Sequence, residues 1–199
     1  MAKRNKKKLN AQLNDNPQIL YQAYGVLRGR LIWTEDNLAG LILTDDTTIT
    51  ISGCKAELMP WLNRRRAQLE TESHLWGVYP RQDSMNELHL TLATRTLVAP
   101  PLAEDNFIIA GRVSAPPNGQ HIFVEICRNR LSRNQANRNS EPTSFHLTIK
   151  GNLLMAHVGQ IWRLQCVRSG LNIQMYQADH LQTSDMHSPD FIEFHPTIL

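Results

Sequence analysis

The fold is decided by two similar stretches, HLWGVYPRQDSMNELHLTLATRTL at residues 74–97 and QIWRLQCVRSGLNIQMYQADHL at residues 160–181. Each contains a tryptophan, an alternating segment, an arginine, a turn, a second alternating segment and a closing leucine. Alternation of apolar and polar residues is typical of strands with one buried face. Each stretch is therefore predicted to form an antiparallel β-hairpin.

The two stretches are separated by a nearly constant offset along the chain. Trp76 corresponds to Trp162, 86 residues later, and upstream Arg30 corresponds to Arg112, 82 residues later. A constant offset is typical of an internal repeat, which predicts two copies of one unit of about 80 residues. The alternative is a chance likeness between two unrelated hairpins.

Further alternating segments precede each stretch, so the whole chain is predicted to be mainly β. GVLRGRL and AGLILTDDTTITISG precede the first stretch, and FIIAGRV, HIFVEICRNR and SFHLTIKG precede the second. One clear helix is expected in KAELMPWLNRRRAQLETE, where Leu58, Leu62 and Leu69 keep a helical spacing. Pro60 fits only in the first turn of a helix, so this helix is expected to begin near Met59.

This order of elements resembles that of the OB-fold, a five-stranded Greek-key barrel with a helix or loop between its third and fourth strands. The resemblance covers residues 21–99 and 106–181 and lies in element order, not in a fixed motif. It implies two tandem small antiparallel barrels, each with a ligand groove across its second and third strands. Such a groove often holds single-stranded nucleic acid, and in other OB-folds it binds protein. The second unit has no clear helix, which leaves SH3-like or split barrels open.

The predicted domain organisation follows from these segments. It comprises a basic flexible arm at 1–18, a first barrel at 19–99, a linker at 100–105, a second barrel at 106–181 and a C-terminal tail at 182–199.

The net charge of +3 is unevenly distributed. Five of the 21 basic residues lie within the first ten positions, which leaves 16 bases against 18 acids in the rest of the chain. A body that is slightly acidic overall weakens the case for nucleic-acid binding. All of the later basic residues except Lys55 and Lys150 are arginine. The arginine guanidinium binds phosphates through two parallel hydrogen bonds and stacks on planar groups, which favours nucleic-acid binding.

No familiar catalytic or nucleotide-binding motif is present. The chain lacks GxxxxGK[ST], GxGxxG, GxSxG, HExxH and the HxE with PCxxC pairing of deaminases. Its three cysteines are scattered, and the loose group of His180, Asp185, His187 and His195 has no regular ligand spacing. We therefore expect no enzyme activity, no cofactor and no metal site.

Strand parity places basic and aromatic side chains on outward sheet faces, because alternate residues of a strand point to opposite sides. Cations on such a face meet phosphates, and rings stack on bases at about 1–3 kcal/mol per base. On such faces the predicted nucleic-acid-binding residues are Arg28, Arg30, Arg112, Lys150, Arg163 and Tyr176. Arg128, Arg130, Arg133 and Arg138 are predicted to lie in a polar loop that clamps a nucleic-acid backbone. The alternative is that each belongs to an ordinary solvated outer face.

The sequence thus predicts a protein that binds RNA or single-stranded DNA, with little sequence readout. The alternative is a scaffold or accessory subunit of a larger, possibly ribonucleoprotein, assembly, which binds protein through the apolar tail FIEFHPTIL. No apolar run approaches the roughly 20 residues that cross a bilayer. The basic N-terminus is not followed by the apolar segment of a secretory signal, so a cytoplasmic location is expected.

Overall fold

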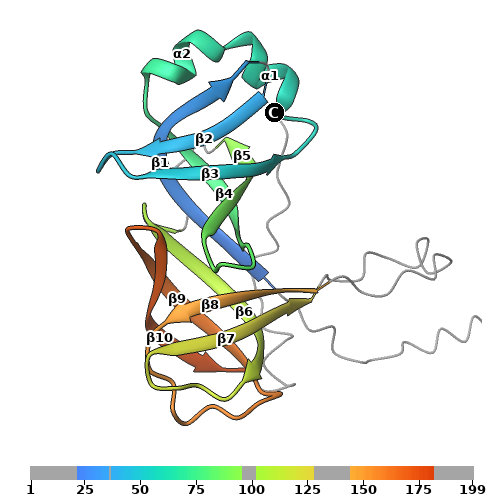
Figure 1. Ribbon diagram of the computed structural model, residues 1–199, viewed down its shortest axis with the longest axis vertical. Coiled ribbons are helices and arrows are strands. Elements are labelled where there is room, and N and C mark those ends of the chain that lie inside the picture. The colour runs from blue at the N-terminus through green and yellow to red at the C-terminus, as the bar shows by residue number, and fades with distance from the viewer. Residues whose placement is uncertain (1–21, 36, 96–101, 128–143, 182–199) are drawn as a thin grey trace, which may run out of the picture.

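The computed structural model of the chain describes residues 22–35, 37–95, 102–127 and 144–181. These residues form one continuous sheet of ten strands, which is rolled into two barrels that lie end to end (Figure 1). The prediction of a mainly β, OB-like fold is confirmed.

The first barrel contains five strands. They are β1 (Gln22–Thr34), β2 (Asn37–Leu43), β3 (Thr48–Cys54), β4 (His74–Gln82) and β5 (Leu88–Arg95). Their hydrogen-bonded order is β2-β3-β5-β4-β1, and the pairing of β1 with β2 closes the barrel. The ladder between β3 and β5 is parallel, and the other ladders are antiparallel.

The second barrel repeats this order of strands. It contains β6 (Asn106–Ala115), β7 (His121–Cys127), β8 (Ser144–Lys150), β9 (Ile161–Ser169) and β10 (Asn172–His180). Their order is β6-β7-β8-β10-β9, and the pairing of β6 with β9 closes the barrel. Trp76 and Trp162 both lie on the fourth strand of their barrel, as the constant offset requires. The descent of both halves from one repeated unit, and the domain boundaries given above, stay predictions.

Two short helices lie at one end of the first barrel, between β3 and β4 (Figure 1). They are α1 (Met59–Arg64) and α2 (Arg66–Thr71), so the helix predicted from Met59 onward is divided at Arg65, whose φ of −116° is not helical. The two arginines at the break have different partners, since Arg65 lies over the Trp61 ring and Arg66 lies over the Trp33 ring. Within the described ranges, no helix has the length and apolar character needed to span a membrane.

The core is built from the inward-facing residues of both barrels. In β5, for example, Leu88, Leu90 and Leu92 are all buried, as their alternating spacing predicts. Burying an aliphatic or aromatic side chain of this size contributes about 1.5–3 kcal/mol relative to leaving it in water. Trp76 is fully buried, and its indole N–H donates a hydrogen bond to the carbonyl oxygen of Gly29 at 2.9 Å. The core therefore holds β4 against β1 by packing and by a directed bond.

The sheet passes from one barrel to the other through an antiparallel ladder between β1 and β6. Residues 22–25 of β1 pair with residues 107–110 of β6, and Gly25 lies opposite Phe107. A Cβ atom at Gly25 would overlap the ring carbons of Phe107. The ring thus occupies the space that the missing side chain leaves, which brings the two strands into register.

The tip of the β4–β5 hairpin provides a second connection between the barrels. The Gln82 side-chain amide donates to the carbonyl oxygen of Thr148 at 3.2 Å and accepts from the Thr148 N–H at 2.5 Å. β10 and β8 pair only at Gln174 and Lys150, so among the described residues the backbone of β8 before Lys150 has no strand partner on that edge. The Gln82 side chain bonds to this backbone at Thr148. Unpaired strand edges favour unwanted association, so covering this edge protects the second barrel.

Ion pairing and stacking add to this connection. Arg168 of β9 is almost fully buried, and its guanidinium lies 2.8 Å from Asp105 and 2.9 Å from Asp45, in the β2–β3 turn of the first barrel. Arg81 of β4 stacks on the ring of Phe145 of β8, 3.6 Å from its centroid. The two barrels are therefore held together by a ladder, an amide bridge and buried charge.

We expect Gly25→Ala to lower the free energy of unfolding by about 1–3 kcal/mol, since the added methyl forces β1 and β6 apart at the Phe107 ring. Urea unfolding followed by circular dichroism measures this change as a lower midpoint. The matched control is Gly53→Ala, where the new Cβ would lie 3.6 Å from Thr91, an ordinary contact distance. Equal losses in both variants would contradict the account of the junction.

Candidate nucleic-acid interface

Four of the predicted binding residues lie on one continuous outer face of the second barrel. Arg112 projects from β6, Lys150 from β8, Arg163 from β9 and Tyr176 from β10. Arg112, Lys150 and Arg163 occupy outward positions, since each is next to a buried residue of its own strand. Tyr176 is exposed beside Met175, which packs against the core. We call this surface the β9–β10 face, and define it as the outward side chains of β6, β9 and β10 together with Lys150.

Cross-strand register arranges the side chains of the β9–β10 face in rows. The rows contain Lys150, Gln174, Val167 and Asn106; then Gln177, Gln165 and Ile108; and then Asp179, Arg163 and Ala110. Directly opposed residues on one face have Cβ atoms about 4.5–5.5 Å apart, and diagonal neighbours lie about 7–8 Å apart. Arg112 is opposite Ile161, which makes it a diagonal neighbour of Arg163. The four predicted residues thus lie within a few side-chain lengths of one another.

Tyr176 stands at an irregularity of β10. The register shifts between Met175 and Gln177, and such a bulge re-aims the side chain at the extra residue. The Tyr176 side chain is 56% exposed, yet its hydroxyl donates a hydrogen bond to Oε1 of Gln165 at 3.3 Å. The ring is therefore both accessible and tethered to β9.

Three glutamines of the β9–β10 face were not predicted from the sequence. Gln165 is half-buried, whereas Gln174 and Gln177 are exposed. Gln174 lies beside Lys150, and Gln165 and Gln177 form the row next to that of Arg163. Their amides carry both donors and acceptors, unlike the arginines and the lysine. The sequence does indicate that these glutamines point outward from two predicted strands. Glutamines on any ordinary solvated face have the same pattern, so the pattern did not single them out for binding. Asp179 is the one acidic residue in the three rows described above.

The outer face of β7 and β8 differs from the β9–β10 face. This is the face to which the OB-fold resemblance assigns the ligand groove. Across it, Glu125 of β7 lies between Arg112 of β6 and His146 of β8. The Thr148 hydroxyl donates to Asn86 of the first barrel at 3.2 Å, and Gln82 holds the Thr148 backbone. A carboxylate thus stands at its centre, and the first barrel occupies part of its edge.

The remaining predicted residues do not reach the β9–β10 face or lie outside the described ranges. Arg28 forms an ion pair with Glu104 at 2.8 Å, and Arg30 is exposed further along β1, on the first barrel. The structure therefore does not bring Arg28 and Arg30 onto the β9–β10 face, because β1 meets β6 only through residues 22–25. Arg128, Arg130, Arg133 and Arg138 belong to the segment that lies outside the described residues.

The cysteines of the chain include two with perturbed acidity. Burial raises the pKa of the Cys166 thiol to about 12, and burial together with Glu57 raises the pKa of Cys54 to about 11. Cys166 is buried, as its strand position predicts, whereas Cys127 is partly exposed. A thiol with a raised pKa stays protonated at neutral pH and is a poor nucleophile, so Cys54 and Cys166 favour a structural role.

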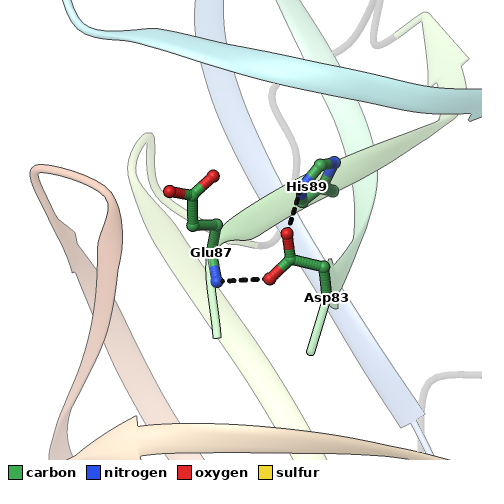
Figure 2. Close-up of side chains that lie close together, drawn as sticks. All are labelled: Asp83, Glu87 and His89. Atoms are coloured by element: carbon green, nitrogen blue, oxygen red, sulfur yellow. Dashed lines mark hydrogen bonds and ion pairs between the residues drawn. The ribbon is translucent and has the colours of Figure 1, made fainter. Parts of the chain in front are cut away.

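A cluster of possible metal-binding groups lies at the β4–β5 turn, in Asp83, Glu87 and His89 (Figure 2). Their donor atoms lie within 4.8 Å of one another, although Asp83 and Glu87 are exposed. One Asp83 oxygen already accepts the backbone N–H groups of Met85 and Glu87, at 2.8 and 3.0 Å, and the other lies 3.4 Å from Nε2 of His89. These bonds shape the turn that carries Gln82 to β8, which accounts for the cluster without an ion.

The Asp83 carboxylate makes stability depend on pH. The bond from the Glu87 N–H, with smaller contributions from Met85 and His89, holds its pKa below the usual value of 3.8. A group whose pKa is lowered by folding stabilises the folded state above its unfolded pKa and loses this effect as the pH falls. We therefore expect Asp83→Asn to flatten the decline in unfolding midpoint below about pH 4. Superimposable pH profiles for variant and parent would contradict this role.

Comparison with known families concerns the same part of the chain as the β9–β10 face. With its five-stranded order and its polar outer face, the second barrel is an OB-type barrel. Residues 109–182 match the model of a family described as a cyanobacterial OB-fold-like RNA-binding domain, C-terminal. The match begins within β6 and continues past the end of β10. No curated protein matches the chain.

Proposed function

We propose that this chain binds RNA through its second barrel, and that it acts by binding and not by catalysis. The observation that carries this proposal is the match of residues 109–182 to an RNA-binding OB-fold-like family. The same residues contain Arg112, Lys150, Arg163 and Tyr176, which share one outer face. A family whose described property is RNA binding and a face of suitable chemistry thus occupy the same 74 residues.

The β9–β10 face suits an unpaired strand better than a duplex. Sequence-directed RNA binding usually engages single-stranded regions, where bases are free to stack on rings and to bond through their edges. The face offers one exposed ring and several amides, flanked by cations that neutralise phosphates. Duplex RNA is instead recognised by shape across successive grooves, which needs a broad basic surface. We therefore infer that the ligand is single-stranded RNA or an unpaired region of a structured RNA.

Other parts of the chain are given supporting roles in this proposal. The basic arm at 1–18 lies outside the described residues, and we propose that it adds salt-sensitive attraction to phosphates. The first barrel supports the second through the β1–β6 ladder and the Gln82 bridge. A cytoplasmic location suits a protein that binds RNA.

Fluorescence anisotropy with labelled single-stranded RNA at low salt tests the proposed function. We expect dissociation constants in the micromolar range, because three cations on a small face give moderate affinity. If Arg112, Lys150 and Arg163 each neutralise one phosphate, the slope of log K against log salt includes about −2 from this face.

Replacing these three residues with glutamine is expected to weaken binding at least tenfold and to remove that part of the salt dependence. Arg64→Gln on α1 is the control, because Arg64 is exposed on the first barrel and bonds only to Pro60 of its own helix among the described residues. Absence of binding to any RNA below tens of micromolar would rule out the proposed function.

Protein binding is the second candidate, favoured by the loop between β8 and β9. Leu154, Met155 and Val158 are 65%, 85% and 55% exposed, an unusual group of large apolar side chains for a short loop. Exposed apolar patches often mark contacts with other proteins. The tail FIEFHPTIL, first considered for this role, lies outside the described residues. Replacing Leu154 and Met155 with serine would abolish such binding and leave RNA affinity unchanged.

A further inference from the structure

The second barrel offers two outer surfaces to an RNA strand, and their chemistry differs. One is the face of β7 and β8, and the other is the β9–β10 face. A surface that recognises unpaired bases requires an accessible ring, groups that bond to base edges, and cations at its border. The two surfaces can therefore be compared against these three requirements.

The accessible ring is that of Tyr176. More than half of its side chain is exposed, and its hydroxyl bonds to Gln165, so the ring is partly ordered before a ligand arrives. A side chain that is already fixed loses less conformational entropy on binding than a mobile one. Tyrosine also has few rotatable bonds for the area it offers, which favours stacking. On the other face, Phe123 of β7 is only partly exposed and lies opposite Thr148, whose backbone Gln82 holds.

The groups that can bond to base edges are the amides of Gln165, Gln174 and Gln177. Gln177 lies directly opposite Gln165, and Gln174 lies one row away, beside Lys150. Each amide presents two N–H donors and a carbonyl acceptor, which matches the mixed donors and acceptors of base edges. Cations alone attract phosphates without distinguishing bases. The combination of three amides around one ring therefore provides the means to discriminate bases.

The cations stand at the border of this group. Arg163 lies in the next row, Arg112 diagonally beyond it on β6, and Lys150 at the opposite edge beside Gln174. Phosphates can thus lie on either side of bases that stack on Tyr176. A carboxylate repels a phosphate nearby, and Asp179 lies opposite Arg163 on this face while Glu125 stands between Arg112 and His146 on the other. Lys150 is paired with neither acid, so the β9–β10 face keeps a cation away from both.

We propose that the β9–β10 face is a base-recognition surface for unpaired RNA, on which Tyr176 stacks a base while Gln165, Gln174 and Gln177 bond to base edges. This inference rests on the proposed function, and it assigns the ligand to the strands β6, β9 and β10 instead of the groove across β7 and β8. It also replaces the expectation of little sequence readout with a preference among bases.

Anisotropy titrations of the full chain with short labelled U, A, C and G homopolymers test this assignment. We expect Tyr176→Ala to weaken binding to the preferred homopolymer by about 5- to 150-fold, the range that follows from stacking one base. Tyr176→Phe keeps the ring and removes the tether to Gln165, so a loss of only about twofold is expected. Replacing the three glutamines with alanine should bring the four affinities close together and leave the salt slope unchanged.

The matched variants on the other face are Phe123→Ala and His146→Ala, which we expect to leave the affinities within about twofold. If these weaken binding and Tyr176→Ala does not, RNA binding stands and the present assignment is overturned. If the unaltered chain binds none of the homopolymers and no structured RNA, the proposed function itself fails.

Photocrosslinking of the unaltered chain to RNA that contains 4-thiouridine provides a measurement that needs no variant. A crosslink mapped to residues 172–180 supports the assignment, whereas crosslinks confined to residues 121–127 and 144–148 overturn it.

Discussion

The antiparallel ladder between β1 and β6 is the constraint on which the rest of the structure depends. It makes one sheet of two closed barrels, and it requires a residue without a side chain at Gly25 so that the Phe107 ring can lie against the strand. Once this ladder is formed, the β4–β5 hairpin reaches β8 and the β2–β3 turn reaches Arg168. The first barrel therefore covers an edge of β8 and the end of β9 at Arg168, and it leaves Gln174, Tyr176 and Gln177 of β10 exposed.

The chemistry of the β9–β10 face is a consequence of strand parity in the closed second barrel. Because most inward positions are apolar, Arg163 and Gln165 of β9 and Gln174, Gln177 and Asp179 of β10 are directed outward, and closure through β6 places the three strands side by side. The bulge at Tyr176 adds an exposed aromatic ring beside the amides and cations of this surface. Under the proposed function, the first barrel supports the second, and the second presents the ligand surface.

Local patterns were sufficient to predict the strands but not the contacts between barrels. The alternation of Leu88, Leu90 and Leu92 correctly predicted that all three are buried, because alternate residues of a strand lie on the same face. The bonds from Gln82 to Thr148 and from Arg28 to Glu104 join residues far apart in sequence, and no local pattern specifies such partners. The spacing of Leu58, Leu62 and Leu69 likewise gave no sign of the helix break at Arg65. The glutamines were missed because an outward glutamine has the same pattern whether it binds a base or water.

Backbone amide chemical-shift mapping by NMR, during titration of the full chain with single-stranded RNA, tests the central claim most directly. The account predicts that the largest shifts fall in β9 and β10, around Gln165, Tyr176 and Gln177, with smaller shifts near Arg112. Shifts concentrated in β7 and around His146 and Thr148 of β8, or an unchanged spectrum at saturating RNA, would contradict it.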